Sequence, residues 1–296
     1  MVKNRPAITL FITLAVIVAM LSLVAIVFGY LSEARTKAQD KAALIQGNVI
    51  YADAVDTLKR FIGKKPSTNI LKNIYNIPLT VAQENGSFNM LIACSPAHAA
   101  IPITWFSQKG GAKDQDRLNL ATFVFEEITT QARLREPETL LRLIQNTLDS
   151  QQNIKFGKEG RLNKRKKYLS YRGFMKILNE YRLQTDDNRA NKISWNLYFS
   201  FGEDYSAIDG NFMSSKLISV VFAIDEQIVQ EDFKSGELKS FLLNNGADMA
   251  LYNSPLFIKT ADAAMKCSAS YTFSKGSYSF SFKYNNGKVD NFEFVQ

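Results

Sequence analysis

AITLFITLAVIVAMLSLVAIVFGYL, residues 7–31, is the stretch that decides how this chain is organised. No charged residue occurs between Arg5 and Glu33. A helix over this uncharged run is about 40 Å long, because each helical residue adds about 1.5 Å. The hydrocarbon core of a bilayer is only about 30 Å thick. The run therefore predicts a membrane-spanning helix, with a cleaved secretory signal peptide as the alternative.

The flanks of the run favour the membrane span. The run is longer than the apolar core of an ordinary signal peptide, and no small-x-small cleavage site closes it. Lys3 and Arg5 precede it without any acidic residue. This charge bias predicts a cytoplasmic N-terminus, with the rest of the chain on the other side of the membrane.

The helix is expected to continue beyond the membrane. Apolar residues follow at spacings of three and four, which is typical of one face of an amphipathic helix. Gly63-Lys64-Lys65-Pro66 then supplies the glycine, cations and proline that end helices. We expect one helix over residues 8–62, which is either a stalk below a signal anchor or a helix that packs among others in a filament. The stripe consists of Ala38, Ala42, Ile45, Val49, Ala52, Val55, Leu58 and Ile62.

Composition leaves room for one or two folded domains beyond this helix. The chain has 296 residues, is 46% hydrophobic and carries a net charge of +8. Much of that charge lies in KEGRLNKRKK, residues 158–167. Such a cluster is either a solvated loop or a patch for anionic lipid or nucleic acid. It contains no aromatic residue for base stacking, so a nucleic-acid partner is disfavoured but stays open.

The two cysteines, Cys94 and Cys267, both follow the predicted span. In an oxidising compartment they can form a disulfide, and otherwise they are buried thiols. Their spacing fits no metal site. The single histidine, His98, is most simply a turn or surface residue of SPAHAAIP, because no motif marks a nucleophile or acid to complete a triad. A membrane-anchored enzyme is therefore the least supported class.

The remaining chain alternates between short strands and helices. Apolar segments 88–94 and 99–106 predict two strands, and residues 109–117 predict a polar turn. Helices are expected over residues 123–134, 137–149, 168–182, 214–228 and 236–243, with a strand at 193–201. Three strands, 267–273, 278–284 and 289–294, follow; the last two are joined by Asn286-Gly287, a strong hairpin signal.

Early and late strands can share one sheet only if the block between them is an insertion. We therefore predict an α+β fold in which the long helix packs on a small antiparallel sheet that carries an inserted α-helical domain. The expected divisions are residues 63–116 for the first part of the sheet domain, 117–254 for the inserted domain and 255–296 for a C-terminal β-meander.

This order of elements resembles the minor pseudopilin K family of type II secretion systems. The N-terminus RPAITLFITLAVI, residues 5–17, resembles a short basic prepilin leader joined directly to an apolar helix. The resemblance implies cleavage by prepilin peptidase between Ala7 and Ile8, so that residues 1–7 are the leader. Ala7 stands where most members have glycine. Ile12 is then the fifth mature residue, where most pilins have glutamate and this family has an apolar residue.

Three internal segments extend the resemblance over nearly the whole chain. Residues 105–123 resemble the strand, turn and K-I-N-L-N motif that lead into the family's inserted domain, and Leu118-Asn119-Leu120 match it. Residues 140–160 keep Asp149, Gly157 and Glu159 of a second motif, and residues 208–225 keep the frame of a third. Because the family can bind calcium near the second motif, the resemblance makes Asp149 and Glu159 candidate ligands.

The resemblance implies a fold and a role. The fold is pilin-like, and the role is non-enzymatic: a capping subunit at the tip of a periplasmic pseudopilus, in a bacterial inner membrane, for protein secretion or the related DNA uptake. The implied partners are the I- and J-type minor pseudopilins. The main alternative is an unrelated single-pass envelope protein that binds partners through its periplasmic domain.

Overall fold

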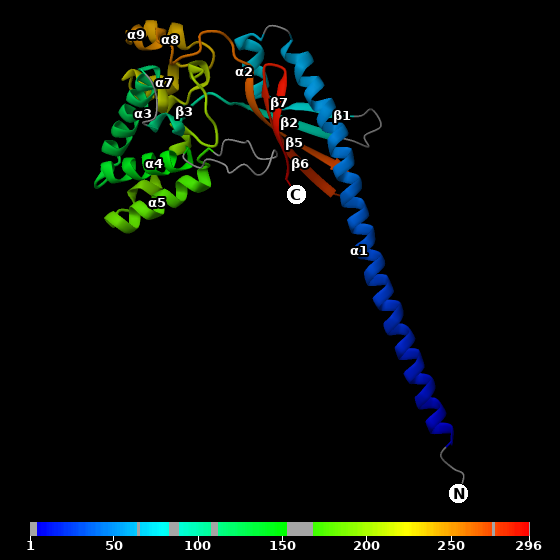
Figure 1. The fold of residues 1–296 in the computed structure, drawn as a ribbon. Coiled ribbons are helices and arrows are strands. Elements are labelled where there is room, and N and C mark those ends of the chain that lie inside the picture. Colours follow the sequence, from blue (N-terminus) through cyan, green and yellow to red (C-terminus); the bar gives the residue numbers. More distant parts are fainter. Residues whose placement is uncertain are drawn as a thin grey trace, which may run out of the picture.

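One helix projects far from the globular part of the molecule. The computed structural model describes residues 5–63, 66–82, 89–107, 112–152, 168–273 and 276–295. In Figure 1 the C-terminal half of this helix lies along a sheet, a helical unit lies on the far side of the sheet, and the N-terminal half stands alone. The predicted α+β architecture, with a pilin-like long helix, is therefore confirmed.

The long helix, α1 (Arg5–Ile62), has 58 residues. Pro6 lies in its first turn, where proline is tolerated because those N–H groups have no helical partner. Gly63 ends it with a φ of 67°, and the amide of Gly63 donates to the carbonyl of Lys59 at 3.0 Å. The expected single helix with a glycine end is confirmed. A short helix that the sequence analysis did not predict, α2 (Thr68–Asn76), follows and is capped by the Ser67 hydroxyl.

The five-stranded sheet joins segments from both ends of the chain. Its order is β1 (Leu79–Ala82), β2 (Asn89–Pro96), β5 (Ala264–Phe273), β6 (Gly276–Asn285) and β7 (Lys288–Val295). All four pairings are antiparallel. Since β2 pairs directly with β5, everything between them is an insertion, as expected. Asn286 and Gly287 have φ values of 47° and 91°, which the β6–β7 turn needs and which explain that dipeptide.

One face of the sheet is covered by α1 and α2. Alternate side chains of β2, β5 and β6 point towards the helices and are buried there, because successive residues of a strand point to opposite faces. Aromatic rings add contacts, such as Tyr51 of α1 against Phe292 of β7 with 4.7 Å between centroids. This first core contains Ile50, Ala54, Val55, Leu58, Ile62, Leu71, Ile74, Met90, Ile92, Cys94, Ala263, Met265, Cys267, Ala269, Tyr271, Phe280, Phe282 and Tyr284.

The inserted unit has a separate core, centred on Trp195. The Trp195 ring meets Phe125 with 6.0 Å and Phe174 with 5.3 Å between centroids. Its α-helices are α3 (Ala112–Gln131), α4 (Pro137–Gln152), α5 (Tyr171–Thr185), α6 (Ser215–Phe222), α7 (Glu226–Asp232), α8 (Leu238–Asn244) and α9 (Met249–Asn253). The described residues of this unit also form a short parallel pair, β3 (Ile101–Pro102) and β4 (Phe199–Ser200), and the 3₁₀ turns η1 (Ile103–Phe106), η2 (Arg189–Lys192), η3 (Trp195–Leu197) and η4 (Gly210–Phe212).

The predicted strand over residues 193–201 is wrong. Within residues 193–201 only Phe199 and Ser200 form a strand, β4, and η3 precedes them. The physical reason is Trp195, whose indole N–H donates to the carbonyl of Ala190 at 2.8 Å while its ring fills the core. The turn that this requires leaves Leu197 37% exposed, so the apparent alternation of apolar residues does not describe one face of a strand.

Other boundaries differ from expectation. The segment expected as a second strand contributes β3 and η1 to the insert rather than a strand to the main sheet, and α3 begins at Ala112, within the predicted turn. The helix predicted over residues 214–228 is divided, because Ala223 has a φ of 52° and ends α6. The buried side chains change from the sheet core to the insert core between Cys94 and Ile101, and change back between Phe257 and Ala263. Both changes differ from the expected boundaries at residues 116 and 254.

Candidate assembly helix and its supports

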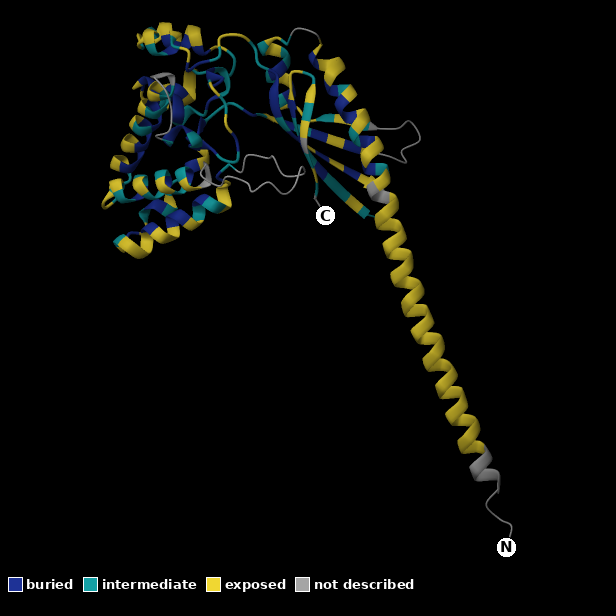
Figure 2. Cartoon of the chain, viewed as in Figure 1, coloured by how far each residue is buried: buried dark blue, intermediate teal, exposed yellow. Residues whose placement is uncertain are grey.

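The N-terminal half of α1 is predominantly apolar, and its described residues, from Leu10 onward, are uncovered. Figure 2 shows its described residues, from Leu10 onward, exposed. The uncharged run within it is long and apolar enough to cross a membrane. Ile12, the predicted marker position, is 56% exposed. The large apolar side chains exposed here are Leu10, Phe11, Ile12, Leu14, Val16, Ile17, Val18, Met20, Leu21, Leu23, Val24, Ile26, Val27, Phe28, Tyr30 and Leu31.

Two hydroxyl groups in the described part of this half bond to the helix itself. Thr13 donates to the carbonyl of Leu10, and Ser22 donates to that of Val18, both at 2.9 Å. In an apolar surrounding a hydroxyl without a partner is costly, and its own helix is the nearest acceptor. These two side chains therefore suit a helix that lies in lipid or among other apolar helices.

The C-terminal half of α1 is fitted closely to the sheet. Gly47 is buried, and a Cβ atom there would lie 2.7 Å from the Tyr271 hydroxyl and 2.9 Å from a ring carbon of Phe294. A side chain at this position therefore cannot be accommodated unless these two aromatic side chains move. Between the two halves lies a neck, residues 32–46, whose described side chains are exposed or half-buried; it carries the exposed ion pair Lys37–Glu33 at 2.6 Å.

The predicted processing site lies within α1. Ala7 and Ile8 are both helical, in the first turns of the element. Their side chains, like residues 1–4, lie outside the part of the chain that the structure describes. Cleavage between Ala7 and Ile8 stays a prediction.

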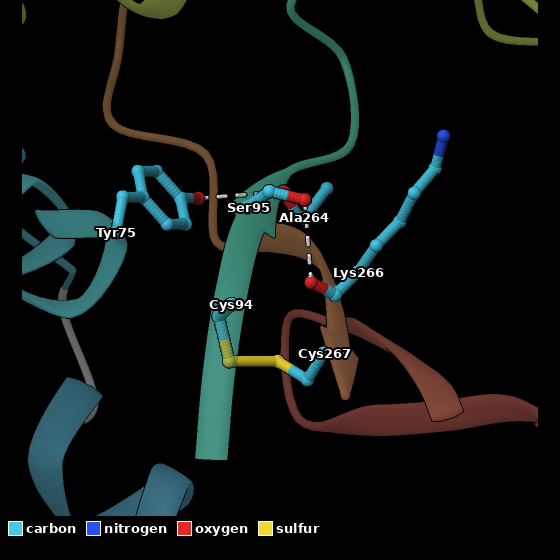
Figure 3. Close-up of a disulfide and its surroundings, with 6 residues drawn as sticks. All are labelled: Tyr75, Cys94, Ser95, Ala264, Lys266 and Cys267. Carbon is cyan, nitrogen blue, oxygen red and sulfur yellow. Dashed lines mark hydrogen bonds between the residues drawn. A yellow bond between two sulfur atoms is a disulfide. The ribbon is translucent and has the colours of Figure 1, made fainter. Parts of the chain in front are cut away.

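Cys94 and Cys267 are joined by a disulfide at the base of the insert (Figure 3). They are direct cross-strand partners in β2 and β5, and both are buried. The chain leaves the sheet just after Cys94 and returns just before Cys267. The disulfide therefore ties together the two strands from which the insert is suspended.

His98 lies in the segment that leads into the insert. Its Nδ1 donates to a carboxylate oxygen of Asp262 at 2.8 Å, and Asn286 of the β6–β7 turn donates to the other oxygen at 3.1 Å. The hydrogen bond from His98 holds the pKa of Asp262 below its usual range. The pair links the segments entering and leaving the insert. His98 and Asp262 are 164 residues apart, so no local motif could have indicated this contact.

Asp209 is a second buried acid beside this pair. Its side chain accepts from the amide of Asn211 at 3.1 Å, and its own amide donates to the carbonyl of His98 at 2.8 Å. Burial raises the pKa of Asp209 to about 6, with Asp262 contributing in the same direction. The sequence analysis assigned no role to Asp209 or Asp262.

The two residues that the sequence analysis named as calcium ligands are Asp149 and Glu159. Asp149 lies in α4 and accepts from the Ser107 hydroxyl at 3.2 Å. Glu159 and the basic stretch 158–167 lie outside the described residues. Among the residues that are described, no three acidic, histidine or cysteine side chains are placed to hold a metal. Calcium takes six to eight oxygen ligands, and because Glu159 is not described, a calcium site here stays a prediction.

Comparison with known proteins finds a similar solved structure. No family model matches the sequence, and no curated protein matches it. A chain in the crystal structure of the GspK–GspI–GspJ complex from the enterotoxigenic Escherichia coli type 2 secretion system is similar to this one. The two are 11% identical with a TM-score of 0.49, over 88% of this chain and 99% of that chain. A likeness of this size concerns the overall shape alone.

Proposed function

We propose that this protein is a non-enzymatic minor pseudopilin that caps a periplasmic pseudopilus of a type II secretion or related DNA-uptake system. One observation carries the proposal. A single uninterrupted helix packs on its own sheet with one half, and the described residues of the other half present an uncovered, predominantly apolar surface. That arrangement suits a subunit that is stored in a membrane and then assembled among similar helices.

Ile12 supports the tip position. In related subunits the glutamate at this point neutralises the terminal ammonium of the neighbouring subunit. An unpaired charge in an apolar bundle is costly, and Ile12 cannot accept such an ammonium. A subunit at the tip has no neighbour above it and needs no acid. The insert adds bulk to the globular end, where it would obstruct a further subunit.

The proposed location and partners follow from this role. The protein is anchored in the bacterial inner membrane by α1 with its globular part in the periplasm, and prepilin peptidase removes residues 1–7. The I- and J-type minor pseudopilins are its proposed partners, as the sequence resemblance implies. The same resemblance supports calcium only as an ion bound by Asp149 and Glu159. No step of the proposed assembly depends on that ion.

The first test is the mature N-terminus. Protein extracted from membranes of the native host should begin at Ile8. A matched variant, Ala7→Gly, restores the residue most members have and should be processed at least as well. A chain that still begins at Met1, or one that begins beyond Leu31, would favour an unrelated envelope protein or a cleaved signal peptide.

The second test is assembly. The full-length protein should co-purify with I- and J-type partners from detergent, and a strain lacking it should lose secretion or DNA uptake. Ile12→Glu places a carboxylate in an apolar helix, at a cost of about 2.5–3.5 kcal/mol where it is unpaired, and should impair assembly or be neutral; Ile12→Leu serves as the control. Undiminished transport without the protein, together with no partner binding, would defeat the proposal.

A further inference from the structure

Two lysines lie side by side on the face of the sheet that α1 does not cover. Lys266 of β5 and Lys283 of β6 are direct cross-strand partners. Their neighbours Cys267 and Phe282 point to the core, so the two lysines point to the opposite face. Like charges directly opposite each other destabilise a sheet. This pair therefore favours a negative group between the two ammonium groups.

Glu203 of the insert supplies that group. One carboxylate oxygen lies 3.3 Å from the ammonium of Lys266, and the other forms an ion pair with Lys283. The Glu203 side chain is only 8% exposed, whereas those of Lys266 and Lys283 are 40% and 33% exposed. A carboxylate buried to this degree requires ionic partners, and here both come from a different unit of the fold.

The segment around Glu203 is held rigidly by the insert. The amide of Gly202 donates to the carbonyl of Leu169 at 2.8 Å, and the indole of Trp105 donates to the carbonyl of Tyr205 at 2.9 Å. Thr104 donates to the Asp204 carboxylate at 2.8 Å. These bonds tie the residues on both sides of Glu203 to the rest of the insert. The position of the Glu203 carboxylate is therefore set by the insert and not by the sheet.

We propose that Lys266 and Lys283 form a carboxylate-binding site on the sheet, and that Glu203 is the positioning residue that seats the insert in it. The helix α1 is packed on the other face of the same strands. The pairing of Glu203 with the two lysines thereby sets the orientation of the insert relative to α1. This inference does not depend on the proposed function.

Hydrogen exchange of the full-length chain in detergent tests this positioning. Two amides report on the junction: that of Asp209, which donates to His98, and that of Ala97, which donates to Ala264 at 3.0 Å. In Glu203→Gln both should exchange about tenfold faster, as expected for loss of a charged hydrogen-bonding partner. Amides of α3 and α5 should be unchanged. Acylation of Lys266 and Lys283, measured by mass spectrometry, should rise in parallel.

Two further variants make the result decisive. Reversing all three charges, with Glu203→Lys, Lys266→Glu and Lys283→Glu, should restore protection, which a merely steric role for Glu203 would not. Asp56→Asn removes the exposed pair with Arg60 on α1 and should change nothing at the junction. Unchanged junction exchange in Glu203→Gln, or failure of the charge reversal to restore it, would overturn the proposal. If Glu203→Gln also speeds amide exchange in α3 and α5, Lys283→Met takes its place. Exchange at Asp209 and Ala97 is then expected to rise in Lys283→Met while α3 and α5 stay unchanged.

Discussion

Asp209 is a carboxyl group that the fold keeps away from water at 3% exposure. Its folded pKa of about 6 lies above the ordinary value of 3.8. Between these values the folded chain retains a proton that the unfolded chain releases. The free energy of unfolding therefore falls as the pH rises through this window. At neutral pH Asp209 therefore destabilises the folded state. Its neighbour Asp262, whose pKa is lowered, stabilises the folded state at the same pH.

Asp209→Asn should therefore stabilise the protein at pH 7, by about 1–3 kcal/mol, and have little effect at pH 4. Asparagine keeps an oxygen that can accept from the Asn211 amide. Urea unfolding followed by the fluorescence of Trp105 and Trp195 measures the effect. Asp262→Asn is the matched control with the opposite sign, because the stability from Asp262 is present above its ordinary pKa and is lost as the pH falls. If the free energy of unfolding depends on pH in the same way in wild type and Asp209→Asn, the assigned role of Asp209 is contradicted.

At the scale of elements, α1 contains two glycines in different surroundings. Glycine within a helix is ordinarily less favourable than alanine by about 1 kcal/mol, so replacement should help wherever space allows. Nothing lies within 4 Å of a Cβ placed at Gly29. At Gly47 the same atom meets Tyr271 and Phe294.

Gly47→Ala should therefore destabilise the contact of α1 with the sheet by about 1–3 kcal/mol, whereas Gly29→Ala should be neutral or slightly stabilising. Amide exchange in β5, compared between the two variants, measures this difference. Protection of β5 that is unchanged in Gly47→Ala would mean that the aromatic side chains yield without cost.

The sequence predicted those elements whose signals are local. The apolar run, Gly63 and Asn286-Gly287 each act within a few residues, and α1 and the β6–β7 hairpin form where they predict. The prediction from sequence failed where packing against distant residues decides the local backbone conformation. The segment around Trp195 turns so that the Trp195 ring fills the core of the insert. The same holds for Ala223, whose left-handed conformation no nearby residue demands. At the candidate site, the exposed apolar surface around Ile12 was predictable, but the contacts of His98 and Glu203 join segments far apart in the chain.

At the scale of the whole molecule, the disulfide and the insert both keep β2 and β5 together. A cross-link over 173 residues is worth up to about 4–5 kcal/mol when the intervening chain is unfolded. When the insert is folded, the Ala97–Ala264 hydrogen bond already holds the ends close. Each restraint therefore contributes most when the other is lost.

The double variant Cys94→Ser, Cys267→Ser should consequently lose only about 1–2 kcal/mol from the sheet while the insert is folded, and more once it is unfolded. Urea titration tests this, with tryptophan fluorescence reporting the insert and β5 amide exchange reporting the sheet. Titration of the denatured, unreduced wild type should find no free thiol. A loss of about 4–5 kcal/mol with the insert intact would contradict the expected redundancy.

The uninterrupted neck of α1 also has an angular consequence. Each helical residue advances about 1.5 Å and turns about 100° around the axis. The number of residues between Leu31 and Gly47 therefore sets the azimuth of the globular part relative to the apolar half. One added residue would rotate every surface of the globular part by about 100° while lifting it only about 1.5 Å, whereas seven would lift it about 10 Å and return it to within about 20°. For a neighbouring molecule that contacts both halves of α1, the rotation of the globular part about the helix axis therefore affects the fit more than its displacement along the axis.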